Sequence, residues 1–155
     1  MTSNAPSYQA GADPSARNRP YFSAIAVLAL LGIAISSVAL QRHFAKSATH
    51  FCEIATQFNC DIVNRSEFST FMGIPVAAIG VIGYAIILLL ATVYRSRHGT
   101  PNILLACALA GVVFSLYLTY IEGWVLDTWC ILCLGSLAII GCITTLAGVV
   151  STRTR

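Results

Sequence analysis

The chain has 155 residues, a formal net charge of +3 at pH 7 and 57% hydrophobic residues, and only 10% of its residues are charged. Its mean hydropathy is +0.77. This length allows one domain, and this composition excludes a soluble globular protein. The sequence also has no dense basic cluster for binding nucleic acid, so it predicts an integral membrane protein.

The N-terminal segment, residues 1–20, is rich in small and polar residues and has too few large apolar side chains to order itself. We therefore expect a disordered cytoplasmic tail. The first apolar segment, residues 21–40, follows Arg17 and Arg19, and residues 37–39 resemble a signal-peptide cleavage site. Its apolar run exceeds the roughly 7 to 15 residues of a signal-peptide core, so the sequence favours a retained transmembrane helix.

Three further uncharged apolar segments follow, at residues 74–94, 102–121 and 130–150. Each has about 20 residues, which in a helix span about 30 Å, the thickness of the hydrocarbon core of a bilayer. Lipid cannot satisfy backbone polar groups, so these segments are expected to be helices, and the short connections make neighbours antiparallel. The sequence predicts an all-α membrane protein, a four-transmembrane-helix bundle with a partly structured outer loop at residues 41–73 and a cytoplasmic tail at residues 151–155.

The charges of the connections predict the orientation, because Lys and Arg close to a span tend to stay in the cytoplasm. The two tails and the connection 95–101 carry six arginines and one aspartate. The connections 41–73 and 122–129 carry three basic and five acidic residues. Both termini are therefore expected in the cytoplasm, and the longer outer loop faces the opposite side.

Four of the six cysteines fall on this outward side, where disulfides form and persist. Cys52 and Cys60 lie in the outer loop, and Cys130 and Cys133 lie at the mouth of the fourth helix. Residues three apart share a helix face, and Cys133 is expected about 4.5 Å deeper than Cys130. Cys130 is then better placed to meet a thiol of the loop, and Cys133 to meet a molecule dissolved in lipid.

Asp127 and Thr128 precede this Cys-x-x-Cys pair and are expected to cap the fourth helix. The N–H groups and dipole at a helix start would stabilise the thiolate of Cys130. Three interpretations of the four cysteines remain open: two static disulfides, a zinc site with four cysteine ligands, or an electron relay between two dithiol pairs. The relay alone uses the access of the second pair to a membrane-soluble two-electron oxidant such as a quinone.

A resemblance to a known family lies in residues 60–85, CDIVNRSEFSTFMGIPVAAIGVIGYA, and in residues 117–133, YLTYIEGWVLDTWCILC. Both stretches resemble the bacterial branch of the vitamin K epoxide reductase family, and the resemblance extends from the first span to the fourth. Its most specific parts are the loop cysteine pair, Ser66 before Phe68, the Gly-Ile-Pro entry at residues 73–75 and the terminal Cys-x-x-Cys.

The resemblance implies a four-helix domain over residues 21–150 around a quinone of the ubiquinone or menaquinone type, in the inner membrane of a bacterial cell. Carried over by position, Cys52 exchanges with a thioredoxin-like or DsbA-like extracytoplasmic partner. Cys60 then passes electrons to Cys130, and Cys133 reacts with the quinone. The implied result is disulfide formation in exported proteins.

Two features depart from the family pattern. Many bacterial members carry a fused thioredoxin-like domain, whereas this chain ends at Arg155, so the partner is expected to be a separate protein. Leu137 stands where the animal enzymes carry a tyrosine associated with vitamin K chemistry, which favours quinone over epoxide as the substrate. The DsbB family is a rival in function, but its Cys-x-x-Cys lies in the first outer loop.

Further residues have both a functional and a structural interpretation. The resemblance assigns Ser66 a hydrogen bond to the quinone, whereas its sequence context is that of a helix cap. Phe68, Phe114 and Trp129 are expected at the quinone, with packing or anchoring at the membrane interface as the alternative. Glu122 is expected to be a solvated interfacial acid, with proton relay as the alternative.

The remaining expectations concern what the chain does not do. We expect no resident metal, and Cys107 and Cys142, in mid-span, are expected to be inert. A non-catalytic alternative is a tetraspan protein whose outer loop is stapled by disulfides for binding a partner. A transporter is disfavoured because the spans contain no Asp, Glu, Lys or Arg.

Overall fold

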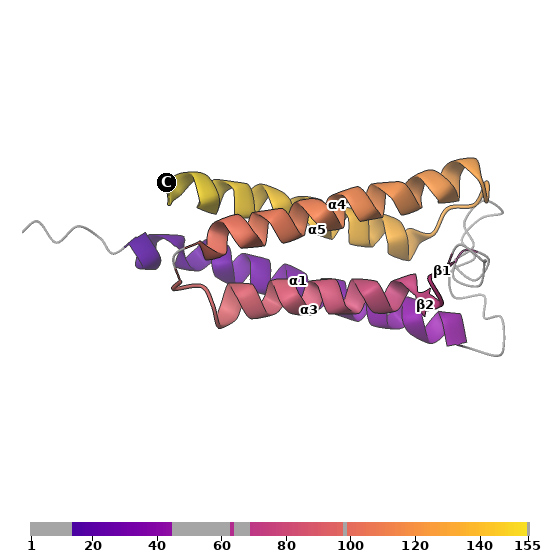
Figure 1. Ribbon diagram of the computed structural model, residues 1–155, viewed down its shortest axis with the longest axis horizontal. Coiled ribbons are helices and arrows are strands. Elements are labelled where there is room, and N and C mark those ends of the chain that lie inside the picture. The colour runs from indigo at the N-terminus through magenta and orange to yellow at the C-terminus, as the bar shows by residue number, and fades with distance from the viewer. Residues whose placement is uncertain (1–13, 45–62, 64–68, 98, 155) are drawn as a thin grey trace, which may run out of the picture.

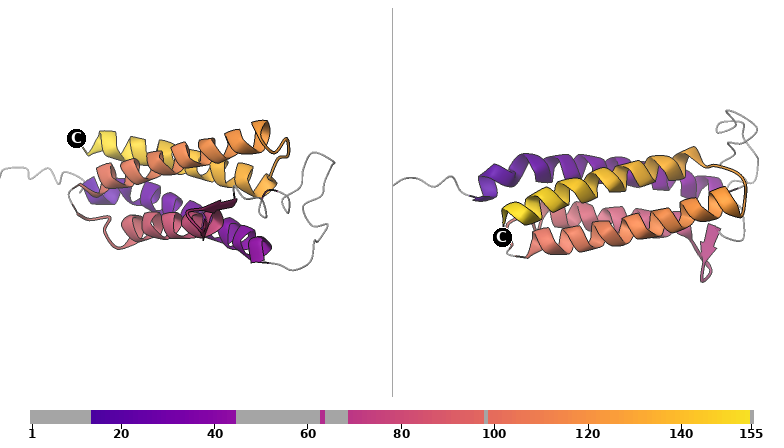
Figure 2. Two further views of the ribbon diagram at one scale, coloured as in Figure 1. Left: turned by 45° about the vertical axis from the view of Figure 1, so that its right-hand side comes forward. Right: turned by 90° about the horizontal axis from the view of Figure 1, so that it is seen from above.

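The structure is a computed structural model that describes residues 14–44, 63, 69–97 and 99–154. Its four helices are α1 (Pro14–Phe44), α3 (Val76–Thr92), α4 (Thr100–Trp124) and α5 (Ile131–Arg153). They lie side by side along a common axis, as Figures 1 and 2 show from three directions. The predicted all-α four-helix bundle is confirmed. The expectations for residues 1–13 and for Cys52, Cys60, Ser66 and Phe68 lie outside the described residues.

The helices have the length and apolar surface that a bilayer requires. Within the described part of the chain, α1 from Asn18 onward, α4 and α5 are long and apolar enough to cross a membrane. The shorter α3 has 17 residues, about 25 Å of helix, which is near the lower limit for a span. Large apolar side chains such as Val27, Ile82 and Val113 are more than half exposed, as expected where lipid covers the surface.

The helix ends differ from the ends of the predicted spans. α1 begins at Pro14, so residues 14–20 are helical and do not belong to a disordered tail. A proline fits the first helical turn because its missing N–H would have no partner there. The helix continues through Pro20, which has no N–H to donate to the preceding turn, so this first part of α1 forms by propagation from the long apolar segment that follows it. α5 likewise continues to Arg153, three residues beyond the predicted span.

The bundle core forms where α1 packs against α3 and α5, and where α4 packs against α5. Its buried members include Phe22, Ile25, Ala29, Tyr84, Ile87, Leu104, Ala108, Ile143 and Val150. Tyr84 of α3 reaches across the bundle to α5, where its hydroxyl donates to the Ser136 carbonyl oxygen at 2.9 Å. A Cβ atom on Gly32 of α1 would lie 2.5 Å from the Tyr84 ring, so glycine is needed for this crossing.

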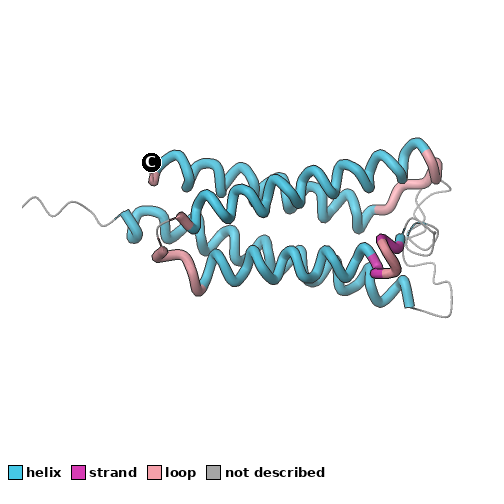
Figure 3. Tube along the Cα trace, in the orientation of Figure 1, coloured by secondary structure: helices cyan, strands magenta, loops and turns pink. Residues whose placement is uncertain are grey.

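A small β-hairpin ends the outer loop directly before α3. Strands β1 (Thr70–Phe71) and β2 (Ile74–Pro75) pair antiparallel through a two-residue turn. Both turn residues, Met72 and Gly73, have positive φ angles, 53° and 83°, which suits the tight turns of hairpins. The hairpin and the α4–α5 connection lie at one end of the bundle, whereas the C-terminus lies at the other (Figure 3).

Candidate active site

The connection between α4 and α5 is a short turn that places Cys130 at the start of α5. The N–H groups of Val125 and Leu126 donate to the carbonyl oxygen of Ile121, at 2.9 and 3.0 Å. Asp127 then takes a left-handed conformation, φ 46°, which aspartate tolerates better than most residues. The chain thereby reverses within a few residues of the end of α4.

The prediction that Asp127 and Thr128 cap α5 is wrong. The N-cap residue is Cys130, in an extended conformation with φ −106° and ψ 114°, and the helix begins at Ile131. Thr128 is held differently, because its N–H donates to the Glu122 carbonyl oxygen at 3.1 Å. The turn, closed by backbone hydrogen bonds to α4, therefore decides where α5 begins.

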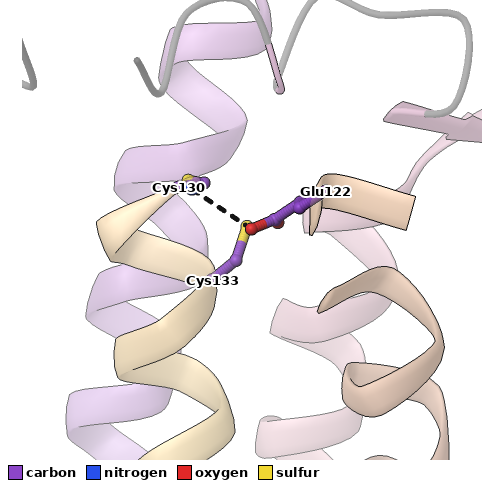
Figure 4. Close-up of side chains that lie close together, drawn as sticks. All are labelled: Glu122, Cys130 and Cys133. Atoms are coloured by element: carbon purple, nitrogen blue, oxygen red, sulfur yellow. Dashed lines mark hydrogen bonds between the residues drawn. The ribbon is translucent and has the colours of Figure 1, made fainter. Parts of the chain in front are cut away.

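Glu122 joins the end of α4 to the start of α5. Its Oε2 atom accepts a hydrogen bond of 3.1 Å from the Cys130 N–H, and its carboxyl group is also a hydrogen-bond partner of the Cys133 side chain. Figure 4 shows the Glu122 side chain pointing from α4 toward Cys133 and the first turn of α5. One carboxyl oxygen and the two cysteine Sγ atoms all lie within 4.8 Å of one another.

The expectation that Glu122 is a solvated acid is wrong, because its side chain is only 2% exposed. A buried carboxyl group needs hydrogen-bond partners to offset its desolvation, and the two cysteines provide them. Its burial depends on α5 folding back over the last turn of α4. The sequence contained one indication, because residues 102–121 are uncharged and Glu122 is the first acid after them.

The two cysteines face different surroundings. Cys130 is fully buried and packs in a small cluster with Val63, a residue of the outer loop, and with Leu126, Leu132 and Cys133. Cys133 is partly buried and borders a cavity between the helices. Of the two cysteines, Cys133 is the one that lines the cavity, and the assignment of Cys130 to the loop and of Cys133 to a lipid-soluble molecule stays a prediction.

The cavity has a volume of about 400 Å³ and is lined by residues of all four helices, most of them apolar. This volume lies within the range of about 300 to 1,000 Å³ that is usual for small-molecule sites. Its polar lining includes Glu122, Ser136 and the pair His43 and Ser69, whose Nδ1 and Oγ atoms lie 3.3 Å apart. The cavity therefore offers an apolar volume with a few polar groups beside Cys133.

The other predicted site residues are distributed unevenly around this cavity. Phe114 of α4 lines it. Trp129 is not among the lining residues, and its indole lies against Gly123, where an added Cβ would come within 3.1 Å of the ring. Cys107, expected to be inert, also lines the cavity, whereas Cys142 is exposed on α5.

His43 and Tyr84 also line the cavity, although the sequence alone does not predict this. A weak signal exists for His43, because Ser36, Ala39 and His43 recur at helical spacing and all line the cavity. Tyr84 gives no comparable signal, since its place in the lining depends on the close approach of α1 and α3.

The comparison with protein families gives a match that covers most of the chain. The model of the vitamin K epoxide reductase family matches residues 23–148. The matched segment runs from the first helix to the last and includes Glu122, Cys130, Cys133 and every residue that lines the cavity.

Proposed function

Since the chain belongs to the vitamin K epoxide reductase family, we propose that it transfers electrons from an extracytoplasmic thioredoxin-like or DsbA-like protein to a quinone. Family membership and the apolar helices make the chain an integral membrane thiol oxidoreductase. The proposal adds the electron donor, the electron acceptor and the cysteines that connect them. Its result is disulfide formation in exported proteins.

The observation that carries the proposal is the position of the Cys-x-x-Cys pair between the outer loop and the cavity. Cys130 packs against Val63 of the loop that contains Cys52 and Cys60, and Cys133 borders the cavity. An electron relay needs this arrangement, with one cysteine of the pair facing the donor and the other facing the acceptor. Two static disulfides would not require the second pair to adjoin a cavity.

The cavity fits the ring of a quinone. Its apolar lining suits a hydrophobic ring, and Phe114 offers an aromatic surface within it. His43 and Ser69 offer polar atoms that can hold a carbonyl oxygen. A bound quinone supplies a two-electron, two-proton acceptor, which matches the oxidation of one dithiol to one disulfide.

The electrons of the partner reach Cys130 and Cys133 by successive thiol–disulfide exchanges. A thiolate of the partner attacks Cys52 and breaks the Cys52–Cys60 bond, which forms a mixed disulfide and releases the Cys60 thiolate. The partner's second thiolate then attacks the partner's own sulfur in this mixed disulfide, so that Cys52 leaves as a thiolate and the partner leaves as a disulfide. The released Cys60 thiolate attacks Cys130 and breaks the Cys130–Cys133 bond. Cys52 then attacks Cys60, which restores the loop disulfide and leaves Cys130 and Cys133 as the dithiol.

Glu122 accepts a proton from the dithiol of Cys130 and Cys133. Its carboxylate is a hydrogen-bond partner of the Cys133 side chain, so the proton can pass from Sγ to a carboxyl oxygen as the thiolate forms. The same carboxylate holds the Cys130 N–H at 3.1 Å and thereby keeps both cysteines in place.

We place the site on the outer side of the bacterial inner membrane, with both termini in the cytoplasm. The arginine-rich segments are the two tails and the connection 95–101. Their described parts lie where α1 begins, where α3 leads into α4 and where α5 ends, and these three points share one end of the bundle. The Cys-x-x-Cys pair lies at the opposite end, which is the oxidising side in this orientation.

The experiment that tests the proposal follows quinone reduction by the purified full-length protein in detergent, with a reduced thioredoxin-like protein as electron donor. Turnover is expected to disappear in Cys130→Ala and Cys133→Ala. Cys142→Ala removes an exposed thiol of the same helix and is expected to leave turnover intact. Equal turnover in the Cys133 and Cys142 variants would refute the assignment.

The non-catalytic alternative predicts a different outcome. In a stapled tetraspan protein, Cys52 and Cys60 stay bridged in the presence of a reduced partner, and no mixed disulfide with the partner can be trapped. Under our proposal, a reduced partner whose second cysteine is replaced by Ala attacks the Cys52–Cys60 bond and stays joined to Cys52, and this complex is visible on a non-reducing gel.

A further inference from the structure

Glu122, Cys130 and Cys133 bring together one oxygen and two sulfur atoms that are all suitable metal ligands. These three atoms lie within 4.8 Å of one another, and the described residues contain no other such group. They come from two different helices, because Glu122 belongs to the last turn of α4 and the cysteines to the start of α5. We propose that the reduced form of this site binds one thiophilic divalent cation, such as Zn²⁺, through these three side chains.

The distances suit this chemistry. Zn²⁺ bonds to thiolate at about 2.3 Å and to carboxylate oxygen at about 2.0 to 2.2 Å, so two ligands of a tetrahedral ion lie about 3.5 to 4 Å apart. Separations of at most 4.8 Å need to shorten by about 1.3 Å at most, which rotation of the side chains can supply. Two thiolates and a carboxylate are also a donor set that zinc accepts, whereas calcium and magnesium prefer oxygen ligands alone.

The surroundings prepare the ligands for a cation. Oε2 of Glu122 accepts the Cys130 N–H, which fixes the carboxyl group and leaves its other oxygen for a metal. Such hydrogen bonds orient ligands in many metal sites. Glu122 and Cys133 also border the cavity, so a water molecule there can fill the fourth position.

Charge gives a further reason for binding. Three anionic ligands in a buried site repel one another and lose their hydration, and a divalent cation offsets both costs. Each thiol loses its proton when the metal binds, so one cation displaces up to two protons from the dithiol. No electron is transferred, and the cation leaves when a chelator removes it.

The consequence is a reversible block of the dithiol. While a cation holds both Sγ atoms, the bond between Cys130 and Cys133 cannot form, and the site stays reduced. This inference goes beyond the proposed electron transfer, because it requires the thiols and the carboxylate but neither the quinone nor the partner. Failure of quinone reduction would leave it standing.

The test measures zinc bound to the full-length protein in detergent, with Cys52 and Cys60 replaced by Ala so that the outer pair contributes no ligand. The protein is reduced, incubated with Zn²⁺, desalted and analysed for its metal content. One Zn²⁺ per chain is expected for the reduced protein and none after oxidation of Cys130 and Cys133. The comparison of reduced with oxidised protein uses the same chain in two redox states, so it needs no substitution of Glu122, Cys130 or Cys133.

The carboxylate is tested separately. Glu122→Gln is expected to raise the dissociation constant for Zn²⁺ at least tenfold, or about 1.4 kcal/mol, because an amide is a poorer ligand. Asp127→Asn neutralises an exposed acid of the adjoining turn and is expected to leave the constant unchanged. Reduced protein that retains no zinc, or that binds it equally well with glutamine at position 122, would overturn the proposed ligand set.

Discussion

Replacing Glu122 by glutamine separates the two roles that its carboxylate has in the proposed function. The amide oxygen of glutamine can still accept the Cys130 N–H, so the start of α5 is expected to stay in place. The amide cannot accept the proton of the Cys133 thiol. Glu122→Gln should therefore fold like the native protein and lose the step in which the thiolate forms.

The expected loss can be estimated from the contacts. A positioned general base contributes about 10² to 10⁴ to a rate, so the glutamine variant should oxidise its dithiol at least about 100-fold more slowly. Glu122→Ala also leaves the buried Cys130 N–H without its acceptor, which costs about 1 to 3 kcal/mol of stability. The alanine variant should therefore be both slow and less stable, whereas the glutamine variant should be only slow.

The assay starts from the reduced protein, mixes it rapidly with quinone and follows the quinone absorbance, so that steps with the partner do not contribute. Thermal unfolding in the same detergent measures stability. Asp127→Asn is the control, because this exposed carboxyl lies five residues away and asparagine also tolerates the left-handed conformation. A glutamine variant that retains a third or more of the native rate would refute the role of Glu122 as a proton acceptor.

Three other substitutions test the packing around the cavity. Gly32→Ala should lower the free energy of unfolding by about 1 to 3 kcal/mol, because the new Cβ would lie 2.5 Å from the Tyr84 ring; unchanged thermal unfolding would contradict this contact. Tyr84→Phe removes the hydroxyl that donates to Ser136 and should cost about 1 kcal/mol by the same measurement, and an equally stable variant would show that this bond contributes nothing. Ala110→Phe fills part of the cavity and should raise the KM for quinone about tenfold, or about 1.4 kcal/mol. Its control, Leu109→Phe, changes an exposed neighbour outside the cavity lining and should leave the KM unchanged, so equal KM values in the two variants would place the quinone elsewhere.

The sequence was sufficient to predict the helices, because the length of an uncharged apolar run reports directly on the bilayer that it crosses. It did not predict where the helices end. α1 extends back to Pro14 and α5 starts only at Ile131, since helix ends depend on local hydrogen bonds that hydropathy does not describe. The hairpin before α3 was likewise missed, although Gly73 is a residue typical of its turn.

Within the site, the place of Cys133 in the first turn of α5 was predictable from the length of the apolar run, whereas the depth order of Cys130 and Cys133 in the membrane stays a prediction. The burial of Glu122 was not predictable. Its partner, the Cys130 N–H, lies eight residues away along the chain, and only the folded turn between α4 and α5 brings the two together. The roles of the outer-loop cysteines, Cys52 and Cys60, stay predictions.

The position of Cys130 at the very edge of α5 also affects how the site can move. Its carbonyl oxygen accepts the Leu134 N–H at 3.0 Å, but its own N–H is held by a side chain of α4 instead of a preceding helical carbonyl. A disulfide needs its two sulfur atoms about 2.05 Å apart, so the pair has to close and open in each cycle. Rotation of the two side chains about χ1 brings the sulfur atoms together while the Cys130 carbonyl keeps the Leu134 N–H and the Cys130 N–H keeps Glu122. The backbone of the turn and the helices can therefore keep their positions while the redox state changes.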